Sequence, residues 1–160
     1  AAPTTTTWMR SFRPADPARQ RSNTKENDMI RGGCLCGGIR YEISGDLWDM
    51  CYCHCQMCRR SHGTPFGNFA AANPRDRRYT EGEELIARYQ SSADAVRTFC
   101  SRCGSKLEFQ NSKDPDEVWI AVGTFDDDPG IRSTSHIWVG SKAPWFEITD
   151  DLKQYLGEPE

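Results

Sequence analysis

The sequence predicts a single, mostly β domain with antiparallel strands, held together by bound metal. Apolar and polar residues alternate in several short segments, turn-forming residues recur between them, and almost no segment has helical spacing. Eight of the 160 residues are cysteines, and they fall into three tight groups. The hydrophobic fraction of 37% is low for a protein with one core, and a thin core usually needs a covalent or metal staple.

The predicted strands follow one another along the chain. In "GGIRYEIS" (37–44), Ile39, Tyr41 and Ile43 share one face, which is the period of two expected of a half-buried strand. Residues 83–91 and 95–100 are predicted to form a hairpin with "SADA" near its turn. Together with these three segments we expect about eight short strands, the others being 47–53, 65–71, 106–110, 117–125 and 135–140.

Helix is expected in two places only. "ITDDLKQYL" (148–156) has apolar residues at a helix-like spacing, and a short helix could follow Cys58. Residues 1–29 are rich in Thr, Pro and Arg and show no hydrophobic period, so we predict an exposed extension, with an organelle transit peptide as the alternative. The domain itself is predicted to span 30–156, followed by a tail at 157–160.

The overall charge argues against two classes of partner. A net charge of -3 gives no general reason to bind nucleic acid or a membrane surface. No apolar run approaches the roughly 18 residues of a membrane span. The N-terminal region lacks the apolar segment of a secretory signal, so we expect a cytoplasmic protein. In a reducing compartment, clustered thiols are more often metal ligands or catalysts than disulfides.

Two of the cysteine groups are pairs that flank the middle of the domain. "CLC" supplies Cys34 and Cys36, and "CSRC" supplies Cys100 and Cys103. Two such pairs are the usual components of a tetrahedral four-thiolate zinc site. Glycines beside both pairs allow the backbone to wrap around an ion. The pattern therefore predicts a structural zinc that clamps the N-terminal strand to the central hairpin, with buried free cysteines or disulfides as the alternative.

The third group, "CYCHCQMC" (51–58), allows a second zinc. On an extended strand Cys51, Cys53 and Cys55 share one face, and Cys58 returns to them across a turn. Three thiolate ligands would leave a position open for water or substrate, whereas four would close the shell. The number of cysteines does not decide between these. A thiol–disulfide redox role is disfavoured because redox pairs usually open a helix in a βαβ unit.

The residues near this third group carry further expectations. His54 alternates with the cysteines and should point away from them, as a packed or exposed imidazole rather than a ligand. Arg59 and Arg60 could offset the negative charge of a zinc–thiolate centre or hold an anionic substrate, and a solvated surface is the other interpretation for each.

Five segments, taken in order, resemble a known family. They are "GGCLCGGIRYEISG", "CHCQMCRRSHGTPF", "RTFCSRCGSKLEF", "VGTFDD" and "HIWVGSKAPWFEI". Together they are similar to the glutathione-dependent formaldehyde-activating enzymes, a family that includes the centromere protein V domain. The similarity covers roughly residues 30–156. It implies the small β-sheet fold called the β-tent, with two Zn²⁺ per chain.

The resemblance also implies a role for each cysteine group. Cys53, Cys55 and Cys58 would be the catalytic residues and hold the catalytic zinc, while Cys51 would be a neighbour whose part in that site stays open. The structural zinc would be held by Cys34, Cys36, Cys100 and Cys103. The implied activity is that of a carbon–sulfur lyase that joins formaldehyde to glutathione and gives S-hydroxymethylglutathione. The alternative is a non-catalytic zinc-binding interaction module, as in centromere protein V.

A substrate pocket is expected near the C-terminal end of the domain. In "KAPWF" (142–146) an aromatic residue is flanked by lysine, which suits an anionic ligand, although Trp145 and Phe146 could equally be core residues. The expected partners are a glutathione-like thiol and a small aldehyde, and a homodimer is left open. The candidates for the pocket wall are Arg60, His136, Lys142 and Trp145.

Overall fold

The structure, a computed structural model, describes residues 29–159 and is built almost entirely of β-strands. The predicted extension at 1–29 therefore lies, except for Met29, outside the described residues. Eleven strands form two sheets. The strands are β1 (Ile30–Gly33), β2 (Arg40–Ile43), β3 (Leu47–Cys53), β4 (Gly67–Ala72), β5 (Arg77–Glu81), β6 (Ile86–Gln90), β7 (Ala95–Cys100), β8 (Lys106–Asn111), β9 (Val118–Ala121), β10 (Ser135–Ile137) and β11 (Lys153–Gln154).

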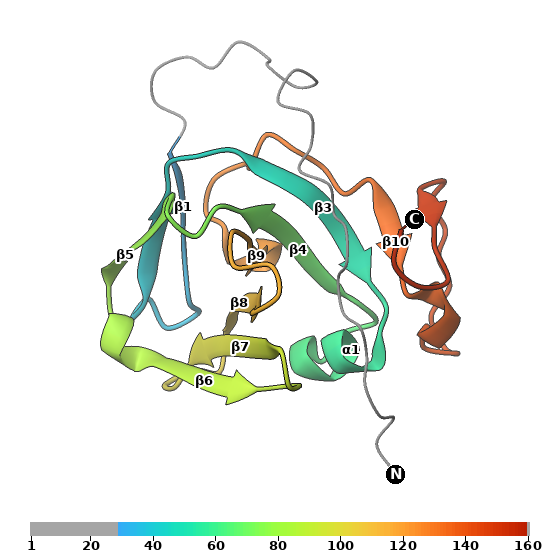
Figure 1. The fold of residues 1–160 in the computed structure, drawn as a ribbon, viewed down its shortest axis with the longest axis horizontal. Coiled ribbons are helices and arrows are strands. Elements are labelled where there is room, and N and C mark those ends of the chain that lie inside the picture. Colours follow the sequence, from blue (N-terminus) through green and yellow to red (C-terminus); the bar gives the residue numbers. More distant parts are fainter. Residues whose placement is uncertain (1–28, 160) are drawn as a thin grey trace.

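The two sheets differ in size and surround a common interior. The small antiparallel sheet has the order β1-β2-β5, and the large sheet has the order β11-β10-β3-β4-β9-β8-β7-β6. Figure 1 shows the small sheet along one side, β3 and β4 crossing above, and β6 and β7 crossing below. The predicted mostly β fold is confirmed. β10 departs from the antiparallel pattern because it pairs in parallel with both β3 and β11.

Alternation of apolar residues explains the central strands. Tyr41 and Ile43 are buried on β2 next to the buried Ile39, as the period of two predicts. The predicted hairpin is also confirmed, since β6 and β7 pair antiparallel, although its first residues form a 3-10 turn at Glu83–Leu85. The predicted strand at 117–125 ends early, because β9 gives way to a second 3-10 turn at Val122–Thr124.

A bulge in β3 fixes which way its cysteines point. The register between β3 and β4 shifts between Trp48 and Cys51, where Asp49 adopts a φ of 47°. Such a bulge adds one residue to a strand and so changes the face on which the following side chains lie. After the bulge, both Cys51 and Cys53 are buried in a cluster formed by residues of the large sheet and α1.

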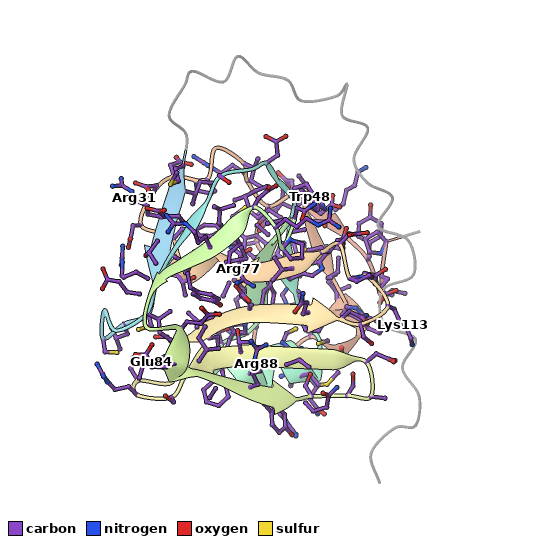
Figure 2. The ribbon with its side chains drawn as sticks, turned by 60° about the vertical axis from the view of Figure 1, so that its left-hand side comes forward. Arg31, Trp48, Arg77, Glu84, Arg88 and Lys113 are labelled. Atoms are coloured by element: carbon purple, nitrogen blue, oxygen red, sulfur yellow. The ribbon has the colours of Figure 1, made fainter. Side chains whose placement is uncertain are left out.

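A buried ion pair joins the two sheets. Arg77 of β5 places Nε 2.6 Å from Oε1 of Glu108 on β8. The Arg77 side chain is 18% exposed and that of Glu108 only 7%, and burial raises the pKa of Glu108. Figure 2 shows Arg77 over the centre of one face, with Arg31 and Lys113 towards its edges. The pair therefore fixes the small sheet against the large one.

The helix predicted at 148–156 is wrong. Residues of this segment form β11, and the Tyr155 amide donates to the His136 carbonyl at 2.9 Å. The amide of Leu152 donates to Oδ1 of Asp150, a local turn that competes with helix formation. Leu156, one of the apolar residues at helix-like spacing, is 80% exposed. A helix here would therefore lack the tertiary packing of its apolar face that stabilises most helices.

The one α-helix of residues 29–159, α1 (Gln56–His62), begins before Cys58 rather than after it. Cys55 is its N-cap, and the helix ends at Gly63 in the left-handed conformation. No helix in this part of the chain has the length and apolar character needed to cross a membrane.

Candidate metal centres

The two distant cysteine pairs meet at one end of the molecule. Cys34 and Cys36 follow β1, while Cys100 ends β7 and Cys103 lies in the turn before β8. Their four sulfurs all lie within 4.8 Å of one another. The Cys34 and Cys36 sulfurs are 3.5 Å apart, and those of Cys36 and Cys100 are 3.9 Å apart. Tetrahedral coordination with bonds of about 2.3 Å requires sulfurs about 3.8 Å apart, so the four residues fit a zinc ion.

The turns around this four-sulfur cluster lower the pKa of Cys34 and Cys103, whereas the pKa of Cys36 is raised. The Ile39 amide donates to the Cys34 sulfur at 3.2 Å. Hydrogen bonds with the Ser105 hydroxyl and backbone lower the pKa of Cys103 to about 5. Gly37 and Gly104 follow the second cysteine of each pair with φ of 71° and 77°, a conformation that glycine adopts without strain. The local backbone is therefore shaped to present sulfur atoms before any ion is bound.

Three further sulfurs gather at the junction of β3 and α1. Cys53 ends β3, Cys55 caps α1 and Cys58 lies in its first turn. Their sulfurs also lie within 4.8 Å of one another, and each residue is only 4% exposed. The Cys58 amide donates to the Cys55 sulfur at 3.3 Å. Hydrogen bonds with the thiols of Cys53 and then Cys58 lower the pKa of Cys55 to about 3, so this three-sulfur cluster favours a thiolate there.

Cys51 lies near the three-sulfur cluster but is not part of it. Its side chain is buried one strand repeat before Cys53, and the group of mutually close sulfurs does not include it. The pKa of Cys51 is raised to about 12, mainly by burial and to a smaller extent by the charge of Cys58. Both Cys51 and Cys58 line a small apolar cavity of about 20 Å³. The sequence left open whether Cys51 is a ligand of the second zinc. In the structure its sulfur lies outside the group formed by the sulfurs of Cys53, Cys55 and Cys58.

Two buried histidines and an exposed aspartate form a hydrogen-bonded chain on the opposite side of the Cys53–Cys55 segment. His54 is fully buried, and its Nε2 lies 2.7 Å from Nδ1 of His136. His136 Nε2 donates to the Asp150 carboxylate at 3.0 Å, while the proton between His136 Nδ1 and His54 Nε2 belongs to one ring or the other according to the protonation state of His136. Burial, followed by the charge of His136, lowers the pKa of His54 to about 4. His54 thus points away from the cysteines, as its alternation with them predicts.

A sequence model of one family matches most of the chain. It describes the glutathione-dependent formaldehyde-activating enzymes and matches residues 29–141. The chain belongs to this family.

Three known proteins are similar to this chain. A Halomonas elongata protein with a provisional name as a glutathione-dependent formaldehyde-activating enzyme is 28% identical over 127 residues, covering 75% of this chain and 81% of that protein. An uncharacterized lyase of Schizosaccharomyces pombe is 23% identical over 124 residues, covering 78% and 88%. A crystal structure of a Rhodobacter sphaeroides protein superposes with a TM-score of 0.52 and 29% identity, covering 64% of this chain and 90% of that one.

The predicted pocket residues of this family member do not form one site. Lys142 and Trp145 line an open pocket of about 480 Å³, together with Phe146 and the following residues. Trp145 is 71% exposed, so it is not a core residue. His136 is buried and holds His54 instead, and Arg60 is exposed on α1. Arg60, His136, Lys142 and Trp145 stay predictions as substrate-binding residues.

One aromatic contact links the pocket to His54, a residue between two cysteines of the three-sulfur cluster. The ring of Phe146 lies 5.9 Å from that of His54, and Phe66 packs against both rings. His54 is bonded to Cys53 and Cys55 along the chain, so Phe146 and His54 connect the pocket to the segment that carries these two sulfurs. A ligand in the pocket would lie against Phe146.

Two features near the sulfurs escaped the sequence interpretation. Arg97 is buried on β7 beside Cys58, and Asp150 anchors His136. Alternation along "AVRTFC" does put Arg97 on the same face as the buried Ala95, so an inward arginine was a detectable signal. No sequence pattern pointed to Asp150, because the segment around it was expected to be helical.

Proposed function

We propose that this chain is a zinc-dependent carbon–sulfur lyase that joins a small aldehyde such as formaldehyde to a thiol such as glutathione. The observation that carries the proposal is the difference between the two clusters, since one offers four sulfurs and the other three. Four ligands complete a tetrahedral shell, whereas three leave a position for a reacting molecule. Membership of the formaldehyde-activating family supports the reaction.

The clusters receive different roles in this proposal. Cys34, Cys36, Cys100 and Cys103 hold a structural zinc that ties the end of β1 to the end of β7. Cys53, Cys55 and Cys58 hold the catalytic zinc. A zinc ion with three thiolate ligands and an open position supplies a place where an incoming thiol loses its proton near neutral pH.

The chain itself positions the reactants and keeps water away. The walls of the cavity beside Cys53 and Cys58 include the apolar side chains of Phe69, Phe109 and Ile137, and Arg97 is the one charged residue among them. In the reaction the thiol loses its proton and its sulfur bonds to the aldehyde carbon. The carbon–oxygen π bond breaks, and the oxygen takes up a proton to become a hydroxyl group. Atoms and electrons balance without an oxidant. Lys142 and Trp145 are proposed to bind the anionic part of the thiol substrate in the open pocket.

A pair of matched cysteine variants tests the proposal. Cys55→Ser should lower the zinc content from two ions per chain to one and abolish hemithioacetal formation, while the circular dichroism spectrum of the folded chain persists. Cys51→Ser changes a buried thiol of the preceding strand, β3, and should leave zinc content and turnover intact. Turnover that survives Cys55→Ser would refute the proposal.

A non-catalytic zinc module is the second candidate, and the presence of Cys51 next to the three-sulfur cluster favours it. If Cys51 completed a second four-thiolate shell, no position would remain for a substrate. X-ray absorption of the zinc-loaded chain separates the two candidates. A nitrogen or oxygen ligand at one zinc supports the enzyme, whereas eight sulfur ligands at two zinc ions, with loss of one ion in Cys51→Ser, support the module.

A further inference from the structure

Arg97 is a buried cation beside the three-sulfur cluster. It lies on β7 with 6% of its surface exposed, and its Nη2 is 3.7 Å from the Cys58 sulfur, within range of an N–H···S hydrogen bond. Its guanidinium carbon lies 4.9 Å from the centre of the Phe109 ring. The same side chain lines the cavity that contains Cys51, Cys53 and Cys58.

No carboxylate neutralises this cation. Within residues 29–159, Arg97 forms no ion pair with an Asp or Glu, whereas the partly buried Arg77 is paired with Glu108. Buried charges are normally paired, because removing an unpaired ion from water costs several kcal/mol. The contact with Phe109 offsets only a part of this cost. The position of Arg97 therefore indicates a negative partner that is not a side-chain carboxylate.

The three-sulfur cluster supplies such a partner once it holds a divalent ion. Three thiolates and one Zn²⁺ carry a net charge of one negative unit, and the guanidinium carries one positive unit. We propose that Arg97 is a positioning residue that supplies the counter-charge of this three-thiolate centre. The inference rests on the proposed function, because it requires zinc at Cys53, Cys55 and Cys58.

The counter-charge also bears on the fourth ligand. A thiolate that enters the open position adds a second negative unit, which a neutral water molecule does not. A fixed cation within hydrogen-bonding range of Cys58 favours the more negative of these two states. Arg97 therefore selects an anionic thiolate over water at the open position, and the hydrogen bond to Cys58 holds the guanidinium in place.

Metal affinity tests this role without any assay of turnover. The full chain is titrated with zinc against a chromogenic chelator, and with Co²⁺ to follow the sulfur-to-cobalt absorption of each site. Arg97→Gln and Arg97→Met should weaken zinc binding at the three-sulfur cluster by about 10- to 100-fold, as is typical when a group that contacts a metal ligand is removed. Binding at the four-sulfur cluster should not change, and it reports that the variant is folded.

Two more variants separate charge from packing. Arg97→Lys keeps the charge but loses the planar guanidinium that stacks on Phe109, so it should retain more of the wild-type affinity than Arg97→Gln does. Arg88→Gln removes an exposed arginine of the neighbouring strand β6 and should have no effect. Titration of the cobalt-loaded chain with 2-mercaptoethanesulfonate should show weaker thiolate binding in Arg97→Gln than in wild type.

The outcomes distinguish the two proposals. If the wild-type chain binds fewer than two zinc ions, the proposed function fails. If it binds two and Arg97→Gln binds both as tightly, or if Arg97→Lys loses as much affinity as Arg97→Gln, the counter-charge role is overturned and Arg97 only packs on Phe109.

Discussion

Gly82 supports the four-sulfur cluster from a distance, and substituting it tests the geometry of that support. Gly82 precedes the 3-10 turn after β5 with a φ of 70°. A Cβ atom built there would lie 1.8 Å from the carbonyl oxygen of Gly38 and 3.2 Å from the Cα of Ile39. Real Cβ atoms essentially never come within 3.0 Å of a non-bonded heavy atom, so Gly82→Ala must push the Gly38–Ile39 backbone away.

The expected cost has two parts. A side chain in the left-handed conformation costs about 1–2 kcal/mol. Displacing the fully buried Ile39 adds a cost like that of overpacking a core, about 1–3 kcal/mol. Gly130 has nearly the same φ, 71°, with no atom within 4 Å of a built Cβ, so Gly130→Ala carries the first cost alone.

Urea unfolding of the zinc-loaded variants measures both costs. We expect Gly82→Ala to lose about 2–5 kcal/mol of unfolding free energy and Gly130→Ala about 1–2 kcal/mol. Gly82→Ala should also weaken metal binding at the four-sulfur cluster, because Gly38 and Ile39 shape the turn that presents Cys34. Equal losses in the two variants would refute the reasoning.

Three further predictions concern the sites and the join between the sheets. Cys100→Ser should bind one zinc fewer and unfold at a much lower temperature, since Cys100 is fully buried in the four-sulfur cluster; a zinc content of two by elemental analysis would contradict this. Glu108→Gln leaves Arg77 unpaired and should cost about 3 kcal/mol in urea unfolding, and an unchanged midpoint would count against the ion pair. Trp145→Ala alters an exposed residue, so it should change stability by less than about 0.5 kcal/mol but raise KM for the thiol substrate; an unaltered KM would remove Trp145 from the proposed pocket.

Sequence patterns predicted the parts of this structure that depend on local chemistry. The alternation of Ile39, Tyr41 and Ile43 placed β2 and its buried face, and the two cysteine pairs placed the four-sulfur cluster. These signals are strong because period and spacing are set by neighbouring residues. β1, β5 and β11 were not predicted, since their sequences show no clear alternation of apolar and polar residues and their strand conformation depends on pairing with other strands.

The parts that escaped prediction depend on contacts between distant segments. Asp150 lies next to His136 only because the C-terminal segment pairs with β10 instead of forming a helix. Arg97 lies beside Cys58 because the β3–α1 junction packs against β7, and the two residues are 39 positions apart. Tertiary pairing outweighs local spacing in both cases.

The two clusters differ in how much chain they span, and this sets the order in which a growing polypeptide could complete them. Cys53, Cys55 and Cys58 leave the ribosome within six residues of one another, so an ion could be captured there while the second half of the protein is still being made. Cys36 and Cys100 are 64 residues apart in the chain, although their sulfurs are separated by 3.9 Å. An ion can bind all ligands of the four-sulfur cluster only after β7 has been synthesised. Because it closes a longer loop than an ion at the three-sulfur cluster, it removes more conformational entropy from the unfolded chain.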